Sequence, residues 1–120
     1  MRSIGKEYEE KAAKHLENKG YKIIDKNFYI RGGEIDIVAK KGEWTIFVEV
    51  KGRGNDSFGS PALSVNFMKQ KRIIKAALFY LKKNYIKMEN IRFDVISIYK
   101  SGDKEEIEHI ENAFFVQGYY

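Results

Sequence analysis

The stretch of sequence that decides the fold is "GEIDIVAKKGEWTIFVEVKGR", which runs from Gly33 to Arg53. It holds two apolar runs joined by "KKGE", a pattern that predicts a β-hairpin. Acidic residues stand where a strand normally carries Val or Ile: Glu34 and Asp36 in the first run and Glu49 in the second. Carboxylates inside a strand pair need a compensating partner, so this hairpin is the first candidate for a functional site.

The rest of the chain predicts one mixed α/β domain built around this hairpin. Periodicity and turn signals predict two helices and five strands: helices at 4–19 and from Pro61 to about Asn84, and strands at 21–30, 34–39, 44–51, 91–99 and 105–114. The order α-β-β-β-α-β-β predicts a central mixed five-stranded sheet flanked by two main helices. A chain of 120 residues is expected to form a single domain, 1–120.

Composition narrows the classes of function. The absence of Cys excludes disulfides and thiolate metal sites. The opening "MRSIGKEYEE" has no apolar core of a signal peptide, and no run approaches 18 apolar residues, so we expect a soluble, cytoplasmic protein with no membrane partner. A net charge of +5 favours polyanions, nucleic acid first, although a merely solubilising surface would carry the same charge.

The register of the hairpin determines whether its charges meet. We expect a turn symmetric about Lys41 and Gly42, which places Glu34 opposite Glu49 and Asp36 opposite Phe47. One face is then wholly apolar and is expected to be the core face, and it comprises Ile35, Ile37, Ala39, Trp44, Ile46, Val48 and Val50. The other face gathers the carboxylates. A three-residue loop would separate Asp36 from Glu49 and abolish this arrangement.

Carboxylates that face one another across strands repel, and partial burial increases the cost. Lys51, on the same face as Glu49, supplies one positive charge. An oxygen-only site of this kind suits Mg²⁺ or Mn²⁺, with Asp36, Glu49 and Glu34 as candidate ligands. Glu9 is a further candidate because it lies on the apolar stripe of the first helix, although at the edge of that stripe it would reach water.

This set of residues fits phosphodiester hydrolysis. A metal held by Asp36 and Glu49 would polarise the phosphate, and Lys51 would orient the attacking water and stabilise transition-state charge. A nucleic acid would approach along the Lys-rich second helix and the segment 52–60, where Lys71, Arg72 and Arg53 are candidate contacts. The alternative for a Glu-x-Lys pair in a strand is an exposed ion pair with no catalytic role.

The Asp…Glu-x-Lys arrangement resembles the restriction-endonuclease-like, PD-(D/E)xK superfamily. The chain more closely resembles the YraN-type family of small predicted endonucleases, related to archaeal Holliday-junction resolvases. The likeness is carried in order by Gly5 and "EEKAAKHL" (9–16), "GYKIIDKN" (20–27), "GEIDIVA" (33–39), "FVEVKGR" (47–53), "FGSPALSV" (58–65), Lys69, "RFDVISI" (92–98) and "HIENAF" (109–114). Tyr8 is a departure, because the family usually has Gly before the helix Glu.

The resemblance implies a restriction-endonuclease-like fold and a metal-dependent endonuclease acting on DNA, with branched or single-stranded DNA as candidates. It implies catalytic roles for Asp36, Glu49 and Lys51, a metal-ligand role for Glu9, and phosphate contact by Lys69. Two alternatives stay open: a nucleic-acid-binding protein with a weak or vestigial nuclease site, and a non-enzymatic protein whose basic face meets an anionic partner.

Three further features receive structural interpretations. Asp94 is expected to form an ion pair with Arg92 or Arg31, and His15 and His109 are expected to be surface or half-buried residues. The aromatic residues from Phe114 to Tyr120 predict either a cover for the core or a patch through which a homodimer forms.

Overall fold

The computed structural model describes residues 4–53 and 65–116. Helix α1 (Ile4–Asn18) is followed by three strands, β1 (Lys22–Ile30), β2 (Gly33–Lys41) and β3 (Trp44–Arg53). Helix α2 (Phe67–Lys83) and the hairpin of β4 (Ile91–Ser101) and β5 (Lys104–Phe114) complete the domain. The predicted order α-β-β-β-α-β-β and the mixed five-stranded sheet are confirmed.

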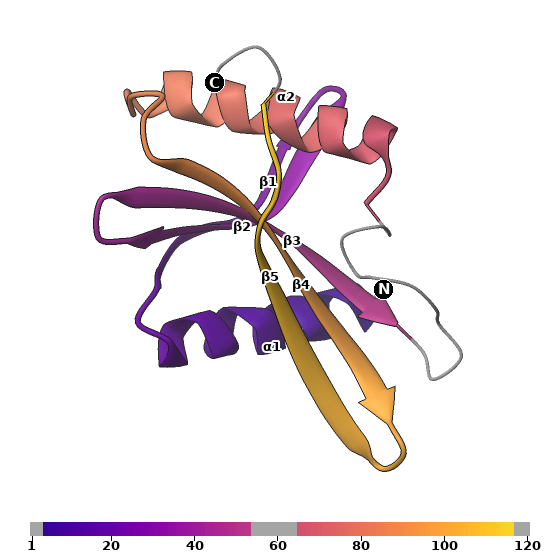
Figure 1. The fold of residues 1–120 in the computed structure, drawn as a ribbon. Coiled ribbons are helices and arrows are strands. Elements are labelled where there is room, and N and C mark those ends of the chain that lie inside the picture. The colour runs from indigo at the N-terminus through magenta and orange to yellow at the C-terminus, as the bar shows by residue number, and fades with distance from the viewer. Residues whose placement is uncertain (1–3, 54–64, 117–120) are drawn as a thin grey trace.

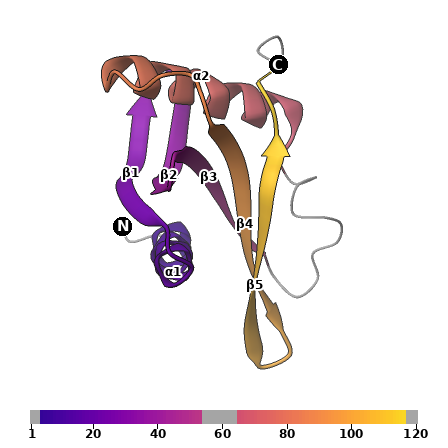
Figure 2. The same cartoon turned by 60° about the vertical axis from the view of Figure 1, so that its left-hand side comes forward.

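The five strands lie side by side in sequence order, β1-β2-β3-β4-β5. β3 and β4 are parallel and the other neighbours are antiparallel. The parallel pair requires a crossover, and α2 provides it between β3 and β4. Figure 1 shows α1 and α2 on opposite sides of the twisted sheet, and Figure 2 shows α1 end-on beneath β1 and β2, with the hairpin of β4 and β5 extending past it.

Helix α2 begins later than the sequence predicted, at Phe67 instead of just after Pro61, which lies outside the described residues. The physical reason is the N-cap. Asn66 has extended backbone geometry, and its side-chain oxygen accepts a hydrogen bond from the main-chain N–H of Lys69 at 2.8 Å. This satisfies one of the free N–H groups of the first turn and fixes where the helix starts.

The predicted register of the central hairpin is wrong by two residues. Lys41 pairs with Trp44 and Val38 pairs with Phe47, so the loop is Gly42–Glu43. Gly42 adopts a positive φ of 60°, which favours this two-residue turn. A slip of two residues keeps the alternation of faces. It moves Asp36 away from its predicted partner Phe47 and toward Glu49.

The expectation of a single core face is also wrong, because both faces of the sheet carry a core. The α1 side buries Ala12, Ala13, Leu16, Tyr21, Ile37, Ala39, Ile46, Val48, Ile96 and Ile98. The core on the α2 side includes Ile35, Val38, Phe47, Ile73, Ala77, Phe93 and Val95. Ile35 and Ile37 therefore belong to different cores, so the alternation of β2 changes phase around Asp36.

Two features of the strands around this change of phase account for it. Opposite Asp36 on β1, between the pairs Lys26–Ile37 and Phe28–Ile35, lies Asn27 with a left-handed φ of 53°. At the start of β2, Gly33 packs so closely on α2 that an added Cβ would lie 2.4 Å from the carbonyl oxygen of Arg72. The first part of β2 thus turns toward α2, and Asp36 stands at the divergence.

Candidate functional site

A polar cavity of about 210 Å³ lies where α1, the divergent strands β2 and β3, and the first turn of α2 converge. It is lined by Gly5, Tyr8, Glu9, Asp36, Glu49, Val50, Lys51, Gly52 and Lys69. The structure therefore brings together five of the residues singled out in the sequence: Glu9, Asp36, Glu49 and Lys51, and also Lys69, which reaches the cavity from α2.

Asp36 takes the place of a ladder hydrogen bond at the point where the two strands separate. The paired residues of β2 and β3 end at Ile37 and Val48. Beyond them, the main-chain N–H of Val50 donates to Oδ2 of Asp36 at 2.8 Å. This bond holds one carboxylate oxygen of Asp36 against β3, beside Glu49.

Glu49 is a buried carboxyl group, only 3% exposed. Burial first, and then the nearby Asp36 carboxylate, raise its pKa to about 8, although the ammonium of Lys69 acts in the opposite direction. Nζ of Lys69 lies 3.3 Å from Oε2 of Glu49. The expected alternative, an ion pair between Glu49 and Lys51, is not the one that forms among the described residues.

The second oxygen of Glu49 is the site's unsatisfied atom. Oε1 is buried and has no hydrogen-bond partner in the described part of the structure. Such atoms are rare in folded proteins, and an ion or a water bound there is one of the recognised reasons for them. An oxygen acceptor that faces the same cavity as Asp36 suits a hard cation.

Glu9 reaches this cavity from α1, as its place on the apolar stripe predicted. It is half-buried, and burial raises its pKa, with Asp36 and more weakly Glu34 acting in the same direction. A hydrogen bond with the side chain of Asn27 opposes this shift. Glu34 is half-buried and does not line the cavity, so its effect on the site is the weak electrostatic one on the pKa of Glu9.

A metal would find two close carboxylates here, and not a complete cage. Among the described residues no three Asp, Glu or His side chains form a ready-made metal-binding group. Asp36 and Glu49 nevertheless fit a divalent cation, because they are adjacent and one buried oxygen has no partner. Mg²⁺ commonly binds to one or two carboxylates and keeps several waters.

Lys51 lines the same cavity as Glu9, Asp36 and Glu49 and is half-buried. Among the described residues, Lys51 forms no ion pair with the carboxylate of Asp36 or with that of Glu49. Its ammonium group is therefore not paired with the buried carboxyl group that Lys69 contacts. This leaves Lys51 available for a negatively charged ligand in the cavity.

Tyr8 closes one wall of the cavity by packing on the backbone of β3. A Cβ added at Gly52 would lie 2.1 Å from Cε2 of the Tyr8 ring. Only glycine permits this approach, so the residue that departs from the family pattern in α1 and the glycine of "VKGR" are matched to each other. The contact holds α1 against β3 at the residue next to Glu9.

Comparison with known proteins decides the family. The model of the uncharacterised protein family UPF0102 matches residues 8–98. The chain belongs to the UPF0102 family. A UPF0102 protein of Thermodesulfovibrio yellowstonii is 51% identical over 115 residues, covering 93% of this chain and 96% of the relative. Those of Geobacter metallireducens and Persephonella marina are 50% and 46% identical over at least 91% of either chain. The resemblance to the YraN-type family is thereby confirmed.

The basic residues of this UPF0102 protein fall into two groups. Lys69 lies in the cavity, paired with Glu49, whereas Lys71 and Arg72 are exposed on the outer side of α2. Nζ of Lys71 lies above the ring of Phe67, 5.3 Å from its centre. Arg53 ends β3, and its side chain lies outside the described part. Helix α2 itself has five Lys, one Arg and no acidic residue.

Sequence reasoning missed three parts of the site. The ion pair between Lys69 and Glu49 joins residues 20 positions apart, and nothing in the local pattern indicates it. The contact of Tyr8 with Gly52 and the acceptance of the Val50 N–H by Asp36 also depend on how distant segments meet. The only available signal was compositional: a glycine next to the Glu-x-Lys sequence indicates close packing.

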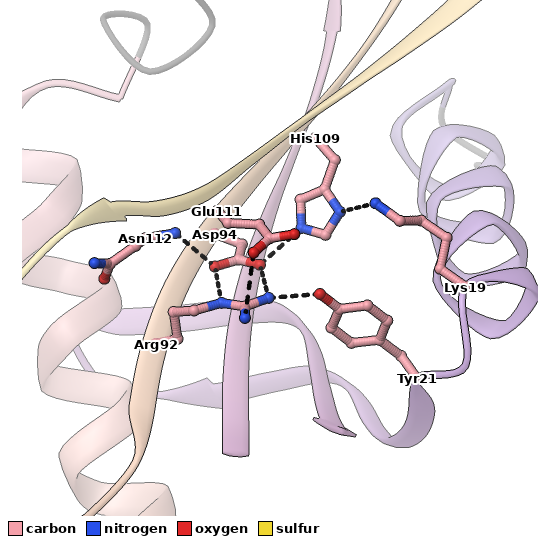
Figure 3. Close-up of polar contacts among 7 residues, drawn as sticks. All are labelled: Lys19, Tyr21, Arg92, Asp94, His109, Glu111 and Asn112. Carbon is pink, nitrogen blue, oxygen red and sulfur yellow. Dashed lines mark hydrogen bonds and ion pairs between the residues drawn. The ribbon is translucent and has the colours of Figure 1, made fainter. Parts of the chain in front are cut away.

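A second polar cluster of this UPF0102 protein lies on the α1 side of β4 and β5 (Figure 3). At its centre Asp94, fully buried, accepts two hydrogen bonds from Arg92 at 2.7 and 2.9 Å. It is also bonded to Nε2 of His109 at 2.7 Å and to the main-chain N–H of Asn112 at 2.9 Å. Burial alone would raise the pKa of Asp94, but these bonds hold it below its ordinary value.

This second cluster connects the hairpin of β4 and β5 to the start of β1. Arg92 donates to the hydroxyl of Tyr21 at 2.6 Å, and Lys19 lies 3.3 Å from Nδ1 of His109. The predicted ion pair of Asp94 with Arg92 is confirmed. Since its charged groups satisfy one another, the cluster is a structural element that joins the sheet to the end of α1.

No helix of the described chain is long and apolar enough to span a membrane.

Proposed function

We propose that this UPF0102 protein is a divalent-metal-dependent endonuclease that hydrolyses phosphodiester bonds in DNA, with branched and single-stranded DNA as candidate substrates. One observation carries the proposal. A buried carboxyl group, Glu49, faces a polar cavity beside Asp36 and Lys51, and among the described residues its Oε1 has no hydrogen-bond partner. This combination is costly for a folded protein unless a cation and an anionic ligand use it.

Each side chain receives a role from its place in the cavity. Asp36 and Glu49 would hold Mg²⁺ or Mn²⁺, with Glu9 close by and Glu34 at the margin. Such an ion, when bound, would supply Lewis acidity toward a phosphate oxygen. Lys51 orients the attacking water and places positive charge next to the phosphate, where it stabilises the additional negative charge of the transition state.

The remaining basic residues serve binding in this proposal. The outer side of α2 presents Lys71 and Arg72, and Arg53 follows the site at the end of β3. Because α2 carries no acidic residue, its field attracts a phosphate backbone along its whole length. Lysine-dominated contacts read charge and not base identity, so we expect binding without sequence preference.

The decisive experiment is a nuclease assay with duplex, single-stranded, flap and four-way-junction DNA, in Mg²⁺, in Mn²⁺ and in chelator. Wild type is compared with Asp36→Asn and with Glu43→Gln, which removes one exposed acidic charge from the turn of the same hairpin. Cleavage should require metal, disappear in Asp36→Asn and persist in Glu43→Gln. Metal-independent cleavage, or full activity in Asp36→Asn, would show that another site or a contaminant is responsible.

A nucleic-acid-binding protein with a weak or vestigial site is the second candidate. It is favoured by the absence of a three-ligand metal group among the described residues, together with the acid-free helix. Binding assays across a salt series separate it from a nuclease: DNA affinity that falls steeply with salt, without cleavage in any metal, supports this second candidate. Affinity that does not change with salt argues against both.

A further inference from the structure

Lys69 has a fixed backbone and a movable charge. Its main-chain N–H is held by the Asn66 cap at 2.8 Å, and Gln70 donates from its side chain to the carbonyl oxygen of Val65 at 2.9 Å. The first turn of α2 is thus anchored on both sides of Lys69. The side chain itself is 35% exposed and ends on a flexible stem, so the ammonium can move while the helix stays in place.

The ammonium of Lys69 stands where positive charge is needed in the metal-free protein. Its partner Glu49 is buried, and Asp36 adds a second negative charge from the neighbouring strand. Lys69 lies 3.3 Å from one oxygen of Glu49, and the other oxygen has no hydrogen-bond partner within residues 4–53 and 65–116. A divalent cation on these carboxylates would supply more positive charge than Lys69 does and would repel the ammonium.

From this geometry, and resting on the proposed function, we propose that Lys69 is an internal counter-cation that gives up Glu49 when metal binds and then contacts the substrate phosphate. Lys69 lines the same cavity as Lys51, so the released ammonium has an anionic ligand within reach and no carboxylate left to neutralise. Lys69 competes with the metal in the free protein and places positive charge on the phosphate in the metal-loaded protein.

A consequence is that metal and phosphate ligand favour each other's binding. A bound metal releases the Lys69 ammonium from Glu49, so the ammonium can contact the phosphate. A bound phosphate draws the ammonium away from Glu49, so the metal no longer competes with Lys69 for that carboxylate. Thermodynamic linkage requires the two effects to be equal in magnitude. Removing the Lys69 charge should therefore strengthen metal binding and weaken the coupling.

The first test is calorimetric titration of Mn²⁺ into wild type, Lys69→Met and a matched control, Lys75→Met. Lys75 is exposed on the same helix and does not line the cavity, so its removal changes net charge equally. Lys69→Met should bind Mn²⁺ roughly tenfold more tightly than wild type, within the usual range of coupling effects. Lys75→Met should bind as wild type does.

Lys69→Gln covers the case in which Lys69→Met does not fold, because an amide can still donate a hydrogen bond to Glu49. It too should bind Mn²⁺ more tightly than wild type. Equal or weaker binding in a folded Lys69 variant overturns the inference and leaves the proposed function standing. If wild type and both Lys69 variants fail to bind Mn²⁺, the metal site itself is wrong, and the proposed function falls with the inference.

The second test measures the coupling without cleavage. In a Lys51→Ala background, fluorescence anisotropy compares DNA affinity in Mn²⁺ and in chelator, with and without Lys69→Met. Mn²⁺ should raise DNA affinity severalfold in the Lys51→Ala protein and distinctly less in Lys51→Ala/Lys69→Met. An equal metal-dependent gain in the two proteins means that Lys69 does not transfer to the phosphate, and it overturns this part of the inference.

Discussion

Asp36 accepts the main-chain N–H of Val50 at 2.8 Å where the ladder between β2 and β3 ends. The Asp36 side chain thus both stabilises the strand pair and lines the candidate site. A variant that removes both functions cannot separate them, whereas a carboxamide of the same shape keeps the acceptor and removes the charge. This distinction underlies the first prediction.

We predict that Asp36→Ala is less stable than Asp36→Asn by about 1 kcal/mol, the usual net contribution of one hydrogen bond. Both variants remove the repulsion with Glu49, so their difference isolates the bond to Val50. Urea unfolding at one pH, in chelator, measures it. Equal stability of the two variants would mean that the Val50 N–H finds another acceptor.

The stability of the metal-free protein should depend on pH through Glu49. The pKa of Glu49 is raised from 4.5 to about 8 in the folded protein, so folding favours the protonated form. The stabilisation is fully present below about pH 4.5 and is lost as the pH rises through about 8. Glu49→Gln should remove this loss and exceed wild type by roughly 1–3 kcal/mol at pH 9, the cost of an incompletely satisfied buried group.

Thermal or urea unfolding of wild type and Glu49→Gln at pH 5, 7 and 9 in chelator checks this prediction. Other groups titrate in both proteins, so the difference between the two curves is the relevant quantity. That difference should grow in favour of Glu49→Gln as the pH rises. A difference that stays constant or reverses would indicate that the ion pair with Lys69 outweighs the cost of burial.

The contact between Tyr8 and Gly52 predicts a double-mutant result. Gly52→Ala places a methyl group into the Tyr8 ring and should destabilise the protein by roughly 1–3 kcal/mol, as overpacking does. In a Tyr8→Ala background the same change should cost distinctly less, because the ring is absent. A double-mutant cycle from urea unfolding gives the interaction energy, and additive effects would argue that Gly52 is needed for its backbone alone.

Lys51→Ala tests the assignment of transition-state charge. Since Lys51 makes no ion pair with Asp36 or Glu49, its removal should leave the free energy of unfolding within about 0.5 kcal/mol of wild type. Single-turnover cleavage should fall by roughly 100-fold to 1,000-fold, as for other electrostatic donors. Wild-type cleavage by Lys51→Ala would remove Lys51 from the proposed mechanism.

The sequence by itself determined which segments are helices and strands and which side chains belong to the candidate site. The apolar runs "EIDIVA" and "WTIFVEVK" and the 3.6-residue stripe of α1 are local patterns, so they predict strands and a helix before the fold is known, although the phase of the alternation in "EIDIVA" changes in the structure. For the same reason Asp36, Glu49 and Lys51 were candidates from their spacing, whereas the position of Glu9 on the stripe left open whether it faced the site or water.

Only the tertiary structure decided how these parts meet. The register of β2 and β3 depends on the turn at Gly42–Glu43, and the change of phase around Asp36 depends on Asn27 and on the contact of Gly33 with α2. The partner of Glu49 is Lys69 and not the nearby Lys51, because α2 crosses back over the sheet and delivers its first turn to the cavity. Contacts between distant segments depend on packing geometry, so local sequence patterns do not predict them.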